Sequence, residues 1–130
     1  MNLKVDRRSK VDNSRLYVME LWIDGRSEPI YKVGKSSGKD SKKRMLDIAG
    51  SYFDKHRVLP RMKIKRDRLV EDVFTKESAM HKMLKEYQYV PVVPFSGSTE
   101  LFDIDFGILM ELYDRVLVDN ICGELVKFED

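Results

Sequence analysis

The fold of this chain is decided by residues 16–34, which read LYVMELWIDGRSEPIYKVG. Residues 16–23 alternate in polarity and are rich in aromatic and branched side chains, which is typical of a β-strand. The cluster at residues 24–29 combines Asp, Gly, Ser and Pro and predicts a turn, after which residues 30–33 form a returning strand. We therefore expect a hairpin that places the tyrosine of each strand in one small sheet.

Helical and extended segments alternate downstream of this hairpin. Asp40 or Ser41 can cap a helix that runs to about residue 49 and carries Arg44 in its first or second turn. Residues 58–65 read as a third strand, with apolar side chains on one face and basic side chains on the other.

The second half of the chain predicts two more helices and one short strand. Asp67 is expected to cap a long helix that ends near Tyr89, before Pro91 breaks the pattern. A strand at residues 100–104 and a final helix at residues 106–118 follow. The sequence thus predicts an α/β fold of the α+β type, with a small, mainly antiparallel sheet of three to four strands flanked by about three helices.

The length of 130 residues is enough for one domain with a buried core. We expect residues 1–14 to form a flexible polar arm and residues 15–130 to form that single domain. No apolar stretch reaches the length of a membrane span, and the N-terminal residues are too polar for a signal peptide. The single Cys122 cannot form an internal disulfide, so a cytoplasmic location is expected.

The charges of the chain are distributed unevenly. Residues 1–68 hold 19 of the 24 basic and 9 of the 22 acidic side chains, a net charge of +10, whereas residues 69–130 hold 5 and 13, a net charge of −8. One interpretation is a basic face that binds a polyanion; the other is that the two halves attract each other within the fold. The modest total charge of +2 predicts weak, salt-sensitive binding of a polyanion.

An ionisable side chain lies on the predicted core face of the long helix. At about 100° per residue, one stripe holds Val70, Val73, Phe74, Glu77, His81 and Leu84. Glu77 lies near the centre of this stripe, where a carboxylate is costly unless a metal ion or an arginine compensates its charge. The alternatives are a partly exposed glutamate at the end of a groove and a plain Glu77–Arg44 ion pair. His81 shares the face of Glu77 and can ligate a metal with it, orient it or contact a phosphate.

Arg44 and Gly34 flank a lysine-rich loop. A guanidinium is planar and permanently charged, which suits a phosphate whose charge grows in a transition state. The alternative for Arg44 is an ordinary exposed helix residue. Gly34 permits close approach where the second strand ends.

Tyrosines in strands usually fill a core and keep a solvated hydroxyl, which is the alternative for Tyr17 and for Tyr31 taken singly. A phenol has an unperturbed pKa near 10, so a tyrosine that acts as a general base needs positive charge nearby. Lysines of the surrounding segments, or a metal ion, could supply it: Lys32, Lys35, Lys42 and Lys43.

Five features follow one another along the chain. They are Leu16-Tyr17-Val18, Tyr31-Lys32-Val33-Gly34, Arg44, the helical Glu77-x-x-x-His81 and the late Glu100-x-Phe102. Their order and spacing resemble the GIY-YIG nuclease superfamily, in particular its short phage and bacterial members, over roughly residues 15–105. The stretch from Gly34 to Arg44 is slightly long for the family pattern, which leaves the arginine role to Arg44 or to a neighbouring lysine.

The resemblance implies a metal-dependent endonuclease that hydrolyses DNA and is encoded by a phage or another mobile element. It implies that Glu77 holds one Mg²⁺ or Mn²⁺ and that His81 belongs to the same catalytic group. It further implies that Tyr17 and Tyr31 line the site, that one of them activates water, and that Arg44 stabilises the phosphate. The expected products are a 5′-phosphate and a 3′-hydroxyl.

Further basic residues are candidates for DNA contact. Arg61, Lys63 and Lys65 share one face of the third strand, where they either follow a DNA backbone or protect a solvated sheet edge. We expect no separate recognition region, so the protein would cut with little specificity, or a homodimer or a protein partner would supply specificity. The competing functions are a catalytically inactive module of the same fold, which binds nucleic acid or a protein, and a protein that binds or cuts RNA. The remaining candidates for nucleic-acid contact are Lys32, Lys35, Lys42 and Lys43.

Overall fold

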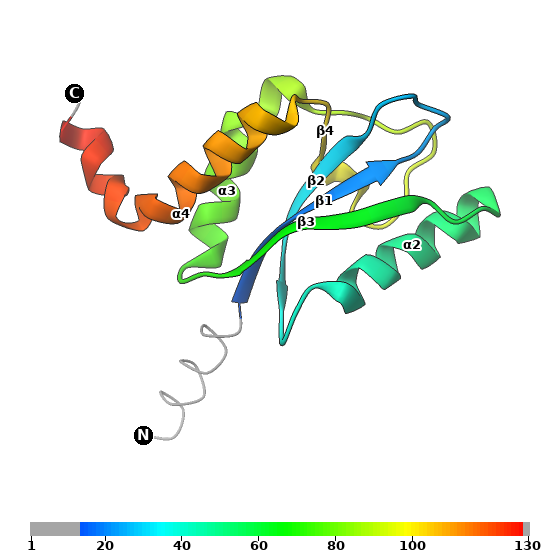
Figure 1. The fold of residues 1–130 in the computed structure, drawn as a ribbon, viewed down its shortest axis with the longest axis horizontal. Coiled ribbons are helices and arrows are strands. Elements are labelled where there is room, and N and C mark those ends of the chain that lie inside the picture. Colours follow the sequence, from blue (N-terminus) through cyan, green and yellow to red (C-terminus); the bar gives the residue numbers. More distant parts are fainter. Residues whose placement is uncertain (1–13, 129–130) are drawn as a thin grey trace.

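The computed structural model describes the backbone of residues 14–128 and the side chains of residues 14–118. Within this part of the chain, four antiparallel strands form one sheet in the order β3-β1-β2-β4, and three helices cover it (Figure 1). The predicted α+β class is confirmed. The elements are β1 (Ser14–Trp22), β2 (Ile30–Ser37), α2 (Lys42–His56), β3 (Arg61–Leu69), α3 (Val73–Met83), β4 (Leu101–Phe102) and α4 (Phe106–Phe128), with one-turn 3₁₀ helices η1 (Lys85–Tyr87) and η2 (Ser98–Glu100).

The predicted hairpin is present as the antiparallel pair β1–β2, in which Tyr17 faces Gly34 and Glu20 faces Tyr31. Side chains of β1 are buried on both faces of the sheet, since Leu16 and Tyr17 are both fully buried although they point in opposite directions. The sheet therefore separates two hydrophobic clusters, one beneath α2 and the other beneath α3 and α4.

Helix α2 covers one face of the sheet and is longer than the sequence predicted. Ile48 and Tyr52 are buried one turn apart in the cluster that also holds Tyr17. The Ala-Gly pair at residues 49–50 looked like a helix end, but the buried stripe continues through Tyr52 and the helix runs on to His56. Ser41 is the N-cap residue, as one of the two expected alternatives.

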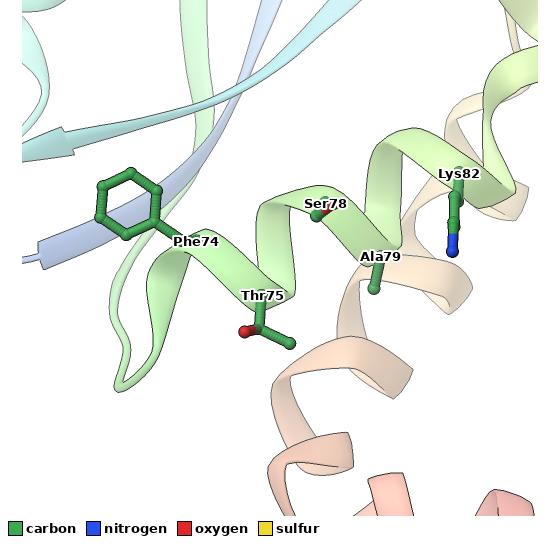
Figure 2. A pocket seen from close by; sticks show the side chains of 5 residues that line it. All are labelled: Phe74, Thr75, Ser78, Ala79 and Lys82. Carbon is green, nitrogen blue, oxygen red and sulfur yellow. The ribbon is translucent and has the colours of Figure 1, made fainter.

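Helix α3 turns one side toward the core and the other outward. Val73, Glu77 and Met80 are buried, whereas Phe74, expected on the core stripe, is 71% exposed. The outer side borders a hollow of about 400 Å³ (Figure 2). Its lining residues are Phe74, Thr75, Ser78, Ala79 and Lys82.

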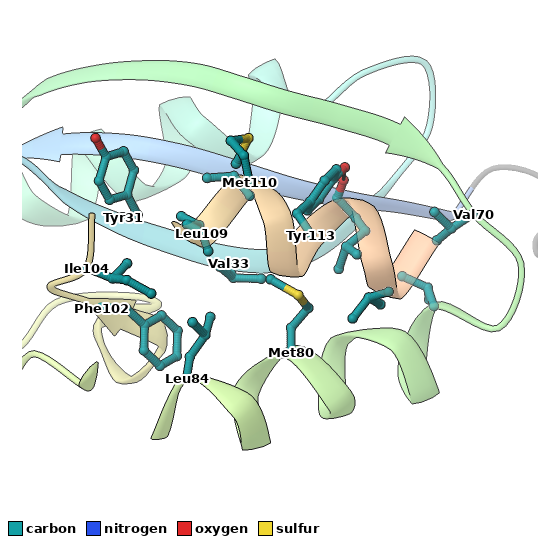
Figure 3. Close-up of a cluster of buried hydrophobic side chains, with 14 residues drawn as sticks. Tyr31, Val33, Val70, Met80, Leu84, Phe102, Ile104, Leu109, Met110 and Tyr113 are labelled. Atoms are coloured by element: carbon teal, nitrogen blue, oxygen red, sulfur yellow. Dashed lines mark hydrogen bonds between the residues drawn. The ribbon is translucent and has the colours of Figure 1, made fainter. Parts of the chain in front are cut away.

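The second face of the sheet packs against α3 and α4 (Figure 3). Met80 of α3 and Leu84, which directly follows this helix, meet Leu109 and Tyr113 of α4 in a cluster that also includes Tyr31. The Tyr113 hydroxyl donates a hydrogen bond of 2.7 Å to the backbone carbonyl of Leu16. Burial of this phenol raises its pKa.

The boundary between the third strand and α3 was predicted wrongly. Asp67 does not cap a helix; it lies inside β3, which extends to Leu69, and Asp72 is the N-cap residue of α3. The strand reaches this far because residues 61–69 pair with β1 along their length. Likewise α3 ends at Met83, and the chain then forms η1.

The short strand β4 leaves most of the β2 edge to other elements. Within β2 it pairs with Tyr31 and Lys32, and its Phe102 also forms an isolated bridge with Gln88. Beyond that point, the Val33 carbonyl lies 2.7 Å from the His81 ring nitrogen of α3. The open edge of β2 is thus the place where α3 and the segment before β4 approach the sheet.

Some expectations fall on residues whose placement the structure does not describe. Residues 1–13 of the expected arm are among them, while Ser14 is the first residue of β1. The side chain of Cys122 also lies outside the described part, although its backbone belongs to α4. Among the described residues, no helix combines the length and apolar character needed to cross a bilayer.

Candidate active site

Tyr17 reaches the edge of the sheet across Gly34. The two residues face each other in the β1–β2 ladder. A Cβ atom placed on Gly34 would lie 2.5 Å from the Tyr17 hydroxyl oxygen, so only glycine leaves room for the phenol. The close approach expected at Gly34 is therefore made by the Tyr17 side chain, whose hydroxyl lies over the outer part of β2.

Lys32 is two residues before Gly34 and lies on the same face of β2. Its side chain is fully buried (0% exposed), and its ammonium group forms an ion pair with the Glu100 carboxylate. The Lys32 nitrogen lies 5.4 Å from the centre of the Tyr17 ring, a cation–π contact. Lys32 is thus an internal charge of this site and not a surface residue.

Arg44 joins the same group from the first turn of α2. A Cβ atom placed on Gly97 would lie 3.1 Å from Nη2 of Arg44 and 3.2 Å from Nζ of Lys32, so both cations flank this glycine. Gly97 has a φ of +81°, which favours glycine as well. Among the described residues, the Arg44 guanidinium has no hydrogen-bond or ion-pair partner, and it is therefore available to an anion.

Glu77, His81 and Glu100 form a compact group of potential metal ligands. One donor atom of each lies within 4.8 Å of the other two. Glu77 is only 7% exposed; its Oε1 accepts a hydrogen bond of 3.1 Å from Nζ of Lys35. Each of the two carboxylates in this group has a lysine partner, since Glu77 pairs with Lys35 and Glu100 pairs with Lys32.

Two buried oxygens of this group lack a hydrogen-bond partner among the described residues: the hydroxyl of Tyr17 and Oε2 of Glu77. A buried polar atom without a partner costs about 1–3 kcal/mol. A water molecule or a metal ion could satisfy Oε2 of Glu77, and a water molecule or a phosphate oxygen could satisfy the Tyr17 hydroxyl. Both atoms can therefore contact a ligand.

Tyr31 is not brought to this group. It is three residues before Gly34 and points to the opposite face of the sheet, where its ring contacts Phe106 with 5.4 Å between ring centres. Its hydroxyl donates a 3.3 Å hydrogen bond to the Glu20 carboxylate. Burial, followed by the charge and hydrogen bond of Glu20, raises the pKa of Tyr31 to about 12, which disfavours the phenolate that a general base requires.

A second hollow lies next to Tyr31 on this opposite face. Its volume is about 460 Å³ and it includes the acidic residues Glu28, Asp103 and Asp105. Neither this hollow nor the one beside α3 includes Tyr17, Arg44 or Glu77. The candidate site is thus an edge of the sheet and is separate from both hollows.

The other predicted basic residues divide into two sets. Lys42 and Lys43 are exposed at the start of α2, directly before Arg44. Arg61, Lys63 and Lys65 lie on β3, at the opposite edge of the sheet from the site. Arg61 stacks on Trp22 and Lys65 on Phe106, at 4.6 and 4.9 Å from the ring centres, so neither is brought to the candidate site.

Asp67 holds the start of α2 in place. Its Oδ2 accepts a 2.8 Å hydrogen bond from the Ser41 backbone N–H, and its Oδ1 accepts one of 3.0 Å from the Ser41 hydroxyl. Arg15 donates to the same Oδ1 at 2.6 Å and also to the Gly38 carbonyl at 3.3 Å. Because Arg44 is three residues after Ser41, this network fixes the position from which Arg44 reaches the site.

The roles of Gly97 and Asp67 at the site were not predicted from the sequence, where Asp67 was expected to cap a helix, and Lys32 was expected only as one of several lysines near the tyrosines. For Lys32 a signal existed, because residues 32 and 34 share a face of a strand whereas residues 31 and 34 do not. No such local signal marks Gly97 or Asp67, since their contacts join segments far apart in the sequence.

Comparisons with known proteins do not place the chain in a family. Scans of protein-family models, of curated proteins and of solved structures each give no match.

Proposed function

We propose that this protein is a metal-dependent endonuclease that hydrolyses phosphodiester bonds of DNA with a GIY-YIG-like site. The observation that carries the proposal is that Tyr17, Arg44 and Glu77 gather around the Lys32–Glu100 ion pair at one sheet edge, with two buried oxygens that lack a partner among the described residues. These three side chains come from three different elements, so their meeting is a property of the fold and not of a local motif.

The residues present fit a divalent metal ion. Glu77 offers a buried carboxylate oxygen that has no partner within the described part of the chain, next to further oxygen and nitrogen donors. When bound, Mg²⁺ or Mn²⁺ would polarise the phosphate and stabilise the leaving oxygen. Glu77 would hold the ion, as the resemblance to the GIY-YIG superfamily implies.

Tyr17 is the tyrosine we assign as the general base. As a phenolate, Tyr17 would accept a proton from a water whose oxygen forms the new bond to phosphorus while the bond to the 3′ oxygen breaks. The ammonium of Lys32 lies 5.4 Å from the centre of the Tyr17 ring, so a positive charge lies beside the proposed base. The products are a 5′-phosphate and a 3′-hydroxyl, the latter protonated from solvent.

Arg44 would hold the phosphate during this step. Its guanidinium is only partly exposed and can form two parallel hydrogen bonds to phosphate oxygens. Negative charge grows on those oxygens in the transition state, so the contact strengthens as the reaction proceeds. Exposed Lys42 and Lys43 would extend the contact along the DNA backbone.

Incubation of the purified chain with supercoiled plasmid in Mg²⁺, Mn²⁺ or EDTA tests the proposal. We expect nicked and linear DNA with either metal, none in EDTA, and nicks that DNA ligase reseals because they carry a 5′-phosphate and a 3′-hydroxyl. Single-stranded DNA and RNA tested in parallel identify the substrate. A folded protein that binds DNA but cuts none of these substrates would instead be a catalytically inactive binding module.

A further inference from the structure

We infer that Glu77, His81 and Glu100 together form a mixed oxygen and nitrogen centre that binds one divalent transition-metal ion, with Mn²⁺ preferred over Mg²⁺. The role of this centre in catalysis rests on the proposed function, but its metal binding can be measured separately. The resemblance assigned only Glu77 to the metal; the positions of His81 and Glu100 extend the ligand set to three.

The spacing of the three donors suits one ion. Donor atoms bound at about 2.2 Å lie roughly 3 to 4.4 Å apart around an octahedral ion. The three donors here lie within 4.8 Å of one another, so small side-chain movements bring them to a common centre. Glu77 and His81 are held in this relation by one turn of α3, while Glu100 arrives with η2.

The backbone of β2 orients the His81 ring. The Val33 carbonyl lies 2.7 Å from Nε2 and can only accept a hydrogen bond, so Nε2 carries the proton. That tautomer leaves the lone pair of the imidazole on Nδ1, where it is free to bind a metal. A histidine ligand whose second nitrogen donates to a carbonyl is the usual arrangement at protein metal sites.

Glu77 gives an independent indication of a ligand. The side chain is nine-tenths buried, and its Oε2 has no partner among the described residues. Its other oxygen is held by Lys35, and Glu100 is held by Lys32, so each carboxylate has a cationic partner. A bound cation would thus compete with the lysines for these oxygens, and Lys35, which is partly exposed, can turn away.

The combination of two carboxylates and one imidazole favours a transition-metal ion over Mg²⁺. Mg²⁺ prefers oxygen ligands and water, whereas an imidazole nitrogen is better matched to first-row transition ions. Mn²⁺ accepts carboxylates and imidazole together and binds nitrogen-containing sites more weakly than its later neighbours. It is also paramagnetic, so its ligands can be identified directly.

The test is Mn²⁺ binding by the untagged full-length chain, followed by electron paramagnetic resonance. The chain has only two histidines. We expect one bound Mn²⁺ whose spin-echo modulation shows one ¹⁴N ligand. His81→Gln should remove the nitrogen modulation and weaken binding about 10–100-fold. His56→Gln, which changes the histidine stacked on Tyr52, should keep both the nitrogen modulation and the wild-type affinity for Mn²⁺.

Two further variants sharpen the result. Glu77→Gln should weaken Mn²⁺ binding at least as much as His81→Gln, because it removes a charged ligand. Lys35→Gln should tighten binding several-fold, because it removes the cation that occupies Glu77. Circular dichroism of each variant shows that the affinities refer to folded protein.

The inference is overturned if the wild type binds Mn²⁺ without nitrogen modulation, if modulation persists in His81→Gln, or if no Mn²⁺ binds. These outcomes differ from failure of the proposed function. A nitrogen-ligated Mn²⁺ in a protein that cuts no nucleic acid would support the metal centre and contradict the proposed nuclease function. Metal-dependent cleavage without a nitrogen ligand would support the nuclease function and show that only carboxylates bind the metal.

Discussion

The alternation of side chains along β2 separates the residues that can act together from those that cannot. Lys32 and Gly34 face α2 and the candidate site, whereas Tyr31 and Val33 face α3 and α4. Tyr31, which the resemblance places in the site together with Tyr17, thus belongs to the hydrophobic cluster on the opposite face. Its neighbour Lys32 instead lies beside Tyr17 and brings a positive charge to the site.

Phenylalanine substitutions distinguish the two tyrosines. Tyr17→Phe should lower the rate of DNA cleavage by about 10²–10⁴-fold, because it removes the proposed general base. Tyr31→Phe should leave the rate near that of the wild type, because its hydroxyl contacts Glu20 on the other face. Single-turnover cleavage of a labelled duplex measures both. Equal losses in the two variants would place Tyr31 in the reaction and contradict this assignment.

The raised pKa of Tyr31 predicts a loss of stability in alkali. Below about pH 10, the phenol is protonated in the folded and the unfolded chain, and the free energy of unfolding does not depend on it. Between about pH 10 and 12, the unfolded chain releases this proton while the folded chain retains it, so stability falls. Urea unfolding across this range should show a steeper decline for the wild type than for Tyr31→Phe. Parallel declines would show that the pKa of Tyr31 is not raised.

The helices and strands whose apolar patterns are local could be predicted from the sequence. The hairpin and the starts of α2 and the final helix were anticipated because their apolar patterns are contained within each segment, whereas α4 continues to Phe128, beyond the predicted end at residue 118. The end of β3 was not, because Asp67 bonds to Arg15 and Ser41, which are 52 and 26 residues away. Of the site residues, the sequence singled out Tyr17, whose hydroxyl has no hydrogen-bond partner among the described residues.

The residues of the site likewise divide into those that a local sequence pattern indicates and those that only long-range contacts bring together. Glu77 stood out because a carboxylate on a core face is unusual, and the structure places it on that buried face. The Lys32–Glu100 ion pair spans 68 residues, and no local pattern in the sequence indicates it. Gly97 is recognisable only once the cations beside it are placed.

Replacement of Asp67 tests how α2 is held. Asp67→Asn keeps the size of the side chain but puts an amide donor where the Ser41 N–H or Arg15 also donates. We expect a loss of about 1–3 kcal/mol in the free energy of unfolding and a fall in cleavage rate, because Arg44 loses its fixed position. Urea unfolding and cleavage at low temperature measure the two effects. Asp54→Asn, at an exposed position of α2, is the control; a fully active and stable Asp67→Asn would refute the positioning role.

The whole molecule consists of a sheet between two helical layers, with α2 on one face and α3 and α4 on the other (Figure 1). The candidate site lies where both layers approach the edge formed by β2 and β4. The basic residues of β3 lie at the far edge of this sheet. A DNA backbone bound over the site would therefore meet Lys42 and Lys43 before it could meet β3.

This arrangement predicts which lysines contribute to DNA affinity. The double change Lys42→Ala and Lys43→Ala should weaken duplex binding and reduce the slope of log K against log salt by about 0.9 for each lost phosphate contact. The double change Arg61→Ala and Lys63→Ala removes the same charge at the opposite edge and should alter the slope little. Fluorescence anisotropy at several salt concentrations in EDTA gives both slopes. A larger effect at β3 would mean that DNA binds the other edge.

The central claim is that a metal held by Glu77 enables this site to hydrolyse DNA. The most direct measurement is the rate of plasmid nicking in Mn²⁺ by the wild type and by Glu77→Gln, with Glu86→Gln, an exposed glutamate of η1, as the control. The proposed site predicts nicking by the wild type and by Glu86→Gln, and a loss of at least about 100-fold in a folded Glu77→Gln. Nicking by Glu77→Gln at the wild-type rate would contradict the account, because the activity would then arise elsewhere.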